Sequence, residues 1–221
     1  MKESTAAWKT AAEEIELPYP RLQLWAKRAL DLIVALVLLI LVSPLWLLIV
    51  LWIRLDSPGP ALFKQVRIGL RGKPYKVYKF RTMLPNADAL MKEKLANVKE
   101  LDNFVFQDKN DPRITKSGRF LRKTSLDELP QLLNILIGNM SLVGPRPEVP
   151  EIVKHYTPEQ RQRLNVLPGV TGLAQVNGRS ELTLGETIAY DLEYVRNWSF
   201  WLDLKILWKT IFVVLTGKGA Y

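Results

Sequence analysis

The sequence contains no cysteine and a single histidine, His155, among its 221 residues. The absence of cysteine excludes disulfide bonds, thiolate catalysis and cysteine metal sites, and it fits a cytoplasmic setting. One histidine cannot form a histidine metal cluster and leaves little for a Ser-His triad, so we interpret His155 as an ordinary surface residue. Any catalytic chemistry must therefore come from carboxylates, lysines and arginines.

Acidic residues are outnumbered by basic ones, 22 against 31, which gives a formal net charge of +9. This excess predicts an anionic partner: phosphate groups, anionic lipid or nucleic acid. The length allows one domain or one domain with an appendage, and 48% hydrophobic residues are enough for a core. Residues 1–20 are weakly patterned and indicate a peripheral tail, with no evident cleavable signal.

One apolar block, Ala29 to Ile53, has the length to enter a bilayer, for which about 20 residues suffice. Ser43-Pro44 interrupts it near the middle, and Pro44 predicts a kink because it removes a backbone hydrogen bond. Ser43 can hydrogen-bond a carbonyl freed at that bend. The residues leave two outcomes nearly even: a kinked spanning helix, or a re-entrant helix over residues 21–54 whose two halves leave by the same face. Basic residues flank the block on both sides and favour the second outcome slightly: Lys27, Arg28, Arg54, Lys64, Arg67 and Arg71.

Two β-rich runs at residues 62–68 and 75–80 flank Gly69 to Gly72 and predict a β-hairpin. The charges of this region are nearly all positive: Lys64, Arg67, Arg71, Lys73, Lys76, Lys79 and Arg81. We interpret most of them as solvated or in contact with anionic headgroups, and only Lys79 and Arg81 as candidates for binding a phosphate. Residues 86–101 predict a polar helix without chemistry, and residues 110–113 a turn.

The most informative stretch, residues 122–147, opens on two adjacent carboxylates, Asp127 and Glu128. Ser125 with Glu128 matches a capping box, and the residues alone favour this structural interpretation. Pro130 instead favours Asp127 as the cap, since proline is tolerated in the first helical turn. Asp127 would then lie at the N-terminus of the helix, whose free backbone N–H groups suit phosphate and favour the ionised carboxylate. Such a carboxylate can attack phosphorus, and Glu128 can hold Mg²⁺.

Several motifs in a fixed order resemble the bacterial sugar transferase family, the small monotopic polyprenyl-phosphate phosphoglycosyl transferases. They are the proline-broken helix, KFRTM at 79–83, DPRIT at 111–115, SLDELPQ at 125–131, GPRP at 144–147 and PGVTG at 168–172. The resemblance covers roughly residues 22–221. It implies transfer of a sugar 1-phosphate from a UDP-sugar to polyprenol (undecaprenyl) phosphate with release of UMP, the initiating step of exopolysaccharide, O-antigen or glycoprotein glycan assembly.

The resemblance also implies roles for particular residues. Asp127 is expected to form a covalent aspartyl-phosphosugar intermediate, with Glu128 as its catalytic neighbour and both as Mg²⁺ ligands. The membrane helix is expected to be re-entrant, broken at Ser43 and Pro44, with the catalytic domain on the cytoplasmic face of the bacterial inner membrane. The chain looks like the minimal form of the family.

A pyrophosphate is best matched by guanidinium groups. Arg122, Arg146 and Arg179 occupy family motif positions and are the first candidates for binding the substrate, followed by Lys79 and Arg81. Arg146 stands between two prolines, which restrict its backbone.

The C-terminal third predicts further helices. Thr157 to Gln160 matches a capping box. Residues 184–196 predict an amphipathic helix, on which we interpret Asp191 and Glu193 as solvated charges. The tryptophan- and lysine-containing segment from Trp198 onwards favours an interfacial helix slightly over a core helix.

Together these features predict a mainly α fold with a small β-hairpin. The expected parts are a tail at 1–20, a re-entrant membrane helix at 21–54 and a catalytic domain at 55–221.

The alternative function is a membrane-tethered basic module that binds anionic lipid or nucleic acid without catalysis. Of these two ligands, nucleic acid is disfavoured by the lack of a recognition motif. A conventional glycosyltransferase that releases UDP is disfavoured by the motif match. The sequence leaves the sugar open, which loop residues such as 178–186 should select, and also the oligomeric state, a homo-oligomer included.

Overall fold

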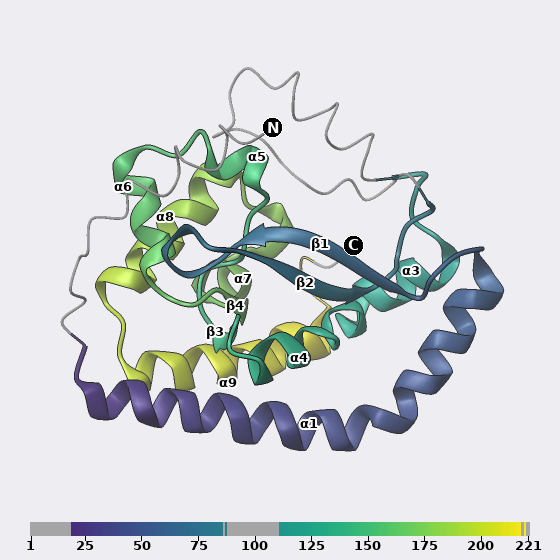
Figure 1. Cartoon of the computed structure of the whole chain (residues 1–221), viewed down its shortest axis with the longest axis horizontal. Coiled ribbons are helices and arrows are strands. Elements are labelled where there is room, and N and C mark those ends of the chain that lie inside the picture. Colours follow the sequence, from purple (N-terminus) through teal and green to yellow (C-terminus); the bar gives the residue numbers. More distant parts are fainter. Residues whose placement is uncertain (1–18, 86, 88–110, 218, 220–221) are drawn as a thin grey trace.

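The computed structural model describes residues 19–85, 87, 111–217 and 219. Residues 1–18 of the expected tail at 1–20 lie outside this range, as does the expected polar helix at 86–101 apart from residue 87. The helices are α1 (Arg21–Asp56), α3 (Lys116–Lys123), α4 (Gln131–Leu136), α5 (Pro150–Val153), α6 (Pro158–Arg161), α7 (Leu173–Asn177), α8 (Leu184–Arg196) and α9 (Phe200–Thr216). The strands are β1 (Leu62–Ile68), β2 (Pro74–Phe80), β3 (Ser141–Val143) and β4 (Gly169–Thr171). The expectation of a mainly helical fold with a small hairpin is confirmed (Figure 1).

Helix α1 is a single 36-residue helix with Pro44 inside it, and it bends in its second half (Figure 1). Proline cannot donate to the carbonyl four residues earlier, which here belongs to Ile40. The hydroxyl of Ser43 donates to that carbonyl at 2.8 Å. The expected compensation at the bend is therefore confirmed.

The first half of α1 is fastened to the rest of the protein by its polar residues. Lys27 Nζ donates to Asp203 Oδ2 on α9 at 2.6 Å, and Arg28 donates to carbonyls at the C-terminal end of α4. Asp31 Oδ1 accepts from the backbone N–H of Leu142 on β3 at 2.9 Å. Lys27, Arg28 and Asp31 thus hold the first half of α1 against α9, α4 and β3.

The hairpin pairs as expected, with Leu62 opposite Phe80 and Ile68 opposite Pro74. A second pair of strands, β3 and β4, is parallel and was not expected from the sequence. Each has three residues, too few to show an alternating pattern. The two backbones approach so closely that a Cβ on Gly169 would lie 2.1 Å from the nitrogen of Gly144. Glycine is therefore required where the GPRP and PGVTG motifs meet.

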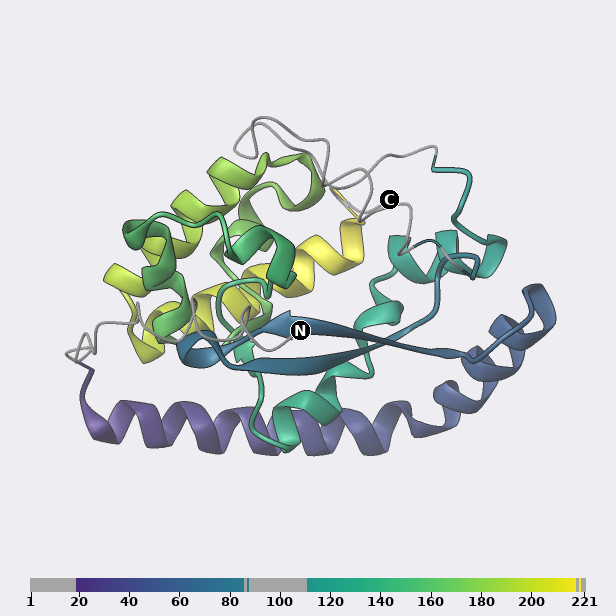
Figure 2. The ribbon, with the colours of Figure 1, turned by 45° about the horizontal axis from the view of Figure 1, so that its top comes forward.

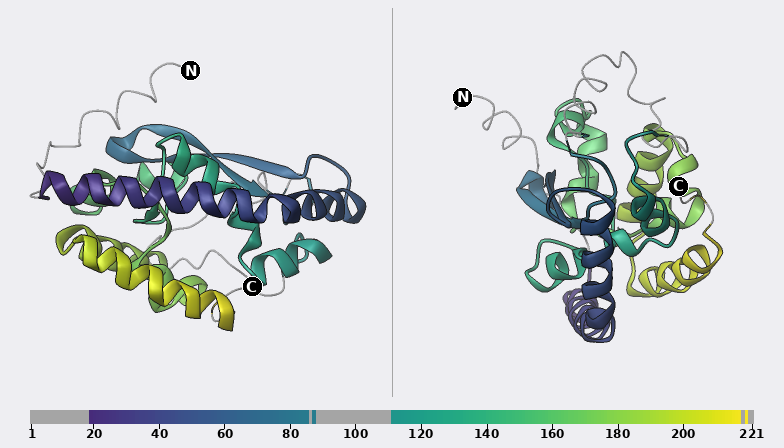
Figure 3. Two further views of the ribbon diagram at one scale, coloured as in Figure 1. Left: turned by 90° about the horizontal axis from the view of Figure 1, so that it is seen from below. Right: turned by 90° about the vertical axis from the view of Figure 1, so that its right-hand side faces the viewer.

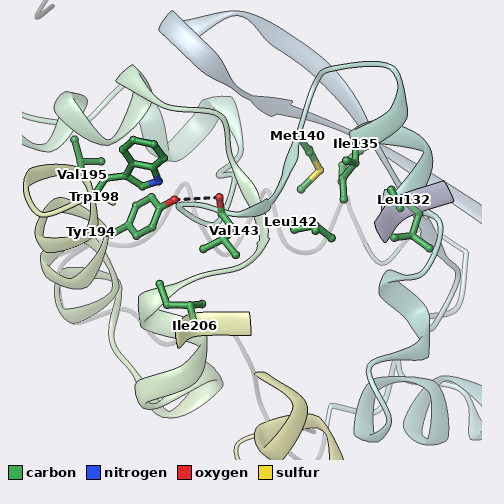
Figure 4. Packing of buried hydrophobic residues seen from close by; sticks show 11 residues of the cluster. Leu132, Ile135, Met140, Leu142, Val143, Tyr194, Val195, Trp198 and Ile206 are labelled. Atoms are coloured by element: carbon green, nitrogen blue, oxygen red, sulfur yellow. Dashed lines mark hydrogen bonds between the residues drawn. The ribbon is translucent and has the colours of Figure 1, made fainter. Parts of the chain in front are cut away.

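The main core joins α1, α4, β3, α8 and α9 (Figure 4). The buried Tyr194 ring packs near Val143, and its hydroxyl donates to the carboxylate of Asp203 at 2.7 Å. Trp198 Nε1 also donates to Asp203, at 3.2 Å. Asp203 is 1% exposed and is satisfied by these donors and by Lys27. This network fixes α9 against α1.

Helices α1 and α9 contact each other and lie along the same side of the molecule, as Figure 1 and the left view of Figure 3 show. In Figure 2 the hairpin β1–β2 lies above α1. On α9 the side chains of Trp201, Trp208 and Leu215 are 77%, 64% and 79% exposed, which is consistent with the expected interfacial helix. Among the described helices, only α1 is long and apolar enough to cross a membrane by length and composition. The location of either helix at a bilayer stays a prediction.

Candidate active site

A cavity of about 490 Å³ gathers all seven sequence-predicted catalytic and substrate-binding residues along its wall: Lys79, Arg81, Arg122, Asp127, Glu128, Arg146 and Arg179. They come from β2, α3, the turn before α4, the loop after β3 and the turn after α7. The fold thus brings together groups that are up to a hundred residues apart in the chain. One of the seven, Arg81, has its guanidinium engaged by backbone carbonyls elsewhere in the fold.

Asp127 and Glu128 lie in a 3₁₀ turn, Leu126–Glu128, that precedes α4. The capping box expected for Ser125 and Glu128 is wrong, because Ser125 has a left-handed φ of 59° and caps nothing with its side chain. Asp127 is not the cap of α4 either, since α4 starts at Gln131 with Pro130 before it. The hydroxyl of Ser125 instead accepts a hydrogen bond from Arg179. Neither carboxylate therefore caps a helix, and both line the cavity.

Glu128 is the anionic centre of a small ion cluster. Its Oε1 accepts from Lys79 Nζ at 2.9 Å and from Arg146 at 3.2 Å. Burial alone would raise the pKa of Glu128, but Lys79 and Arg146 outweigh it and hold that pKa at about 2. Glu128 is therefore ionised at neutral pH and holds two cations at the cavity.

Asp127 accepts no hydrogen bond from any described residue. Burial raises its pKa to about 6, with the charge of Glu128 adding to the rise and Lys79, Arg122 and Arg146 opposing it. The sequence predicted that Asp127 lies at a helix N-terminus, which would favour the ionised form and lower its pKa. The structure shows the opposite direction, because burial raises that pKa. The carboxylate remains mostly ionised at pH 7, unpaired and close to cations, which are the properties of an available nucleophile.

Arg81 lies at the cavity but turns its guanidinium elsewhere. It is 8% exposed, and it donates to the carbonyl of Ser57 at 2.7 Å and to that of Pro58. These carbonyls follow the C-terminal end of α1, where a cation is also favoured by the helix dipole. We therefore assign Arg81 to holding the end of α1 rather than to binding phosphate.

Replacing Arg81 by methionine tests this assignment. Arg81→Met leaves buried carbonyls unpaired and is expected to lower the free energy of unfolding by about 2–3 kcal/mol. Lys79→Met is the matched control, because Glu128 keeps its partner Arg146, and we expect it to weaken donor binding with little change in stability. Unfolding curves of the two variants in the same detergent, with donor titrations, decide the matter. Arg81→Met with wild-type stability would return Arg81 to the phosphate candidates.

The residue that supports Arg146 was missed by sequence reasoning. Arg163 is 2% exposed and donates to the carbonyl of Arg146 at 2.7 Å, to Asp191 and to the hydroxyl of Tyr156. Asp191 is therefore not a solvated charge, as expected, but a carboxylate that is 1% exposed. Its position three residues after Ile188, on the apolar stripe of α8, was the available signal.

The loop that carries Arg146 has each of three consecutive carbonyls bound by a different element. That of Pro145 accepts from the N–H of Gly169 at 2.9 Å, that of Arg146 from Arg163, and that of Pro147 from Arg67 at 2.9 Å. The restricted backbone expected from the flanking prolines is thus reinforced by hydrogen bonds. Arg146 can present its guanidinium to a ligand with little further ordering.

A magnesium ion fits this site only together with phosphate. In the part of the chain that the structure describes, no three Asp, Glu or His side chains form a cluster that could hold a metal. Mg²⁺ is commonly held by one or two carboxylates, with water and substrate phosphates completing the shell. The free carboxylate of Asp127 and its neighbour Glu128 match that smaller requirement, although one oxygen of Glu128 is already shared by two cations.

Comparison with known proteins is consistent with this arrangement. The family model described as bacterial sugar transferase matches residues 22–217. The chain is 46% identical over 199 residues to the undecaprenyl-phosphate galactose phosphotransferase of Salmonella typhimurium, covering 88% of this chain and 41% of that protein. It is 45% identical over 204 residues to the UDP-glucose:undecaprenyl-phosphate glucose-1-phosphate transferase of Escherichia coli, again 88% and 41%. It is also 45% identical over 193 residues to an uncharacterized sugar transferase of Bacillus subtilis, covering 87% of this chain and 89% of that protein. The chain thus spans less than half the length of the first two relatives and most of the third.

Proposed function

This chain belongs to the bacterial sugar transferase family, and we propose that it transfers a sugar 1-phosphate from a UDP-sugar to polyprenol phosphate with release of UMP. The observation that carries the proposal is the unpaired carboxylate of Asp127 in a cavity whose other charged groups are mainly cations. A site of this kind suits an anionic phosphate substrate and supplies a nucleophile for it. The named activities of the two longer relatives support the same reaction.

In the first step an oxygen of Asp127 attacks the phosphorus that bears the sugar. A new O–P bond forms, the bond from that phosphorus to the bridging oxygen breaks, and UMP leaves with the electron pair. In the second step a phosphate oxygen of the polyprenol attacks the same phosphorus, and the bond to Asp127 breaks. The carboxylate is thereby regenerated, and atoms and charge balance over the two steps.

The cations stabilise the charge that develops on the phosphoryl oxygens and on UMP. Lys79 and Arg146 are held in place by Glu128, and Arg179 is held by the hydroxyl of Ser125. Arg122 donates through Nε to the hydroxyl of Thr82 at 2.9 Å, which leaves its terminal nitrogens for substrate. Asp127 and Glu128 would hold Mg²⁺ when phosphate is present, and the ion would supply further charge neutralisation.

The membrane arrangement is also a proposal. Helix α1 enters the bilayer, bends at Ser43 and Pro44, and leaves on the cytoplasmic side of the inner membrane, while α9 lies in the interface. Support comes from the exposed apolar side chains of α1 and α9, two helices that lie along the same side of the molecule (Figure 3). A lipid acceptor would then lie in the same membrane as the protein.

A panel of UDP-sugars with polyprenol phosphate, scored for UMP, tests the proposal. We expect Mg²⁺-dependent UMP release with at least one sugar. Release of UDP would indicate a conventional glycosyltransferase. Lipid binding with no nucleotide released from any donor would favour the alternative, a membrane-tethered basic binding module.

The pH dependence of the first step follows from the raised pKa of Asp127. Only the ionised carboxylate attacks, so kcat/KM for the UDP-sugar is expected to fall about tenfold per pH unit below pH 6. The substituted pyrophosphate of the donor does not titrate between pH 4 and pH 7. The pH dependence of kcat/KM therefore reports the protonation of Asp127. Circular dichroism at pH 5 serves as the control, since the fold should remain. A rate that stays constant from pH 7 to pH 4 would contradict the assignment.

A further inference from the structure

Gln175 lies in the cavity wall with both polar atoms of its amide unpaired. The residue is 9% exposed, it lines the cavity, and neither Nε2 nor Oε1 has a hydrogen-bond partner. A Cβ on Gly172 would lie 2.8 Å from Oε1, so the glycine leaves the room that this amide occupies. A buried amide without partners destabilises a fold. Its position in a cavity wall indicates that a ligand supplies the missing partners.

The wall around Gln175 differs from the wall around Asp127. Its neighbour Ala174 lines the cavity, as do Leu182, which precedes α8, and Leu184, the first residue of that helix, together with Ser180 and Thr187. Helices α7 and α8 are in contact. The cations of the ion cluster come from other elements. Apolar side chains beside an amide suit a planar base, which needs apolar faces and one hydrogen-bonded edge.

We propose that Gln175 reads the nucleobase of the donor. Its amide pairs with the imide edge of uracil, Nε2 donating to a ring carbonyl and Oε1 accepting the N3–H. Arg179, in the next turn of the chain, then lies between the base and the phosphates. This rests on the proposed function only in that the donor is a nucleoside diphosphate sugar. Since both amide atoms are covered in the free protein, pairing includes a change of side-chain rotamer that turns the amide toward the cavity.

Binding of UMP and of N3-methyl-UMP, measured by calorimetry on the full chain in detergent, tests this inference without turnover. The methyl group blocks the imide hydrogen and leaves the rest of the nucleotide intact. Wild type is expected to bind UMP about 10- to 100-fold more tightly than N3-methyl-UMP. Gln175→Leu is expected to bind both equally and weakly. Without ligand, the leucine variant should melt at the wild-type temperature or above, because it removes an unpaired buried amide.

Asn177→Ala is the matched control, since Asn177 is an exposed amide on the same helix, and it should keep the wild-type preference. Gln175→Met, of similar length, replaces the leucine variant if that one does not fold. A variant at Gln175 that keeps the preference for UMP would overturn the inference while leaving the proposed function intact. Wild type that binds no UMP would overturn both.

Discussion

Asp127→Asn is expected to abolish UMP release from every UDP-sugar, with a loss of at least about a thousandfold. Asparagine keeps the size of the side chain and removes the nucleophile. The loss should not come from unfolding, because the folded pKa of Asp127, about 6, lies above its ordinary value of 3.8. A carboxylate with a raised pKa destabilises the folded state wherever it is ionised, and this penalty disappears only as pH falls through 6 towards 4. At pH 7 the variant should therefore be as stable as wild type or more stable.

Glu128→Gln is the matched control on the neighbouring carboxylate. The pKa of Glu128 is lowered from 4.5 to about 2, so its charge stabilises the fold above pH 4.5 and loses this effect as pH falls towards 2. Glu128→Gln should therefore lower the melting temperature at pH 7, while some UMP release remains because Asp127 is intact. The two variants thus have opposite expected effects on stability. Asp127→Asn with more than a few per cent of wild-type activity would remove Asp127 from its role.

Arg163→Met is expected to cost about 3–5 kcal/mol of stability, because it leaves Asp191 buried without its cation. The double variant Arg163→Met with Asp191→Leu replaces the pair by apolar groups and should recover most of that loss. The double variant still lacks the hydrogen bond that Arg163 donates to the carbonyl of Arg146, because methionine has no donor. The double variant should therefore be folded and still slow, by about 10- to 100-fold in kcat/KM, since a displacement of about 1 Å has effects of that size.

Denaturant unfolding and UMP release, measured on the same preparations, separate the two roles of Arg163. A single variant that is unstable and a double variant that is stable but slow would show that Arg163 positions Arg146. A double variant with full activity would mean that the pair serves only packing.

Local signals in the sequence were sufficient for much of the fold. The hairpin, the capping box at Thr157 and the helix Leu184–Arg196 were all predicted. Strand alternation, helix caps and helical periodicity depend only on residues that are close in the sequence. The bend in α1 was predicted with its hydrogen bond, because proline frees one known carbonyl. The motifs also predicted which residues would share one cavity.

Contacts between distant segments could not be predicted. The parallel pair of β3 and β4 depends on two three-residue stretches whose backbones meet at glycines. The partners of Arg81 lie at the end of α1, and the partner of Asp191 lies in the 3₁₀ turn after α6. A charge in a sequence is read as solvated until the fold supplies its counter-ion. The pKa of Asp127 was expected in the wrong direction because its burial follows from that same packing.

The most direct measurement is mass spectrometry of the protein after reaction with a productive UDP-sugar in the absence of polyprenol phosphate. The proposed mechanism predicts a sugar phosphate attached to Asp127, formed together with one equivalent of UMP and lost when polyprenol phosphate is added. UMP release and lipid product in the presence of acceptor, with no adduct on Asp127 in its absence, would contradict it.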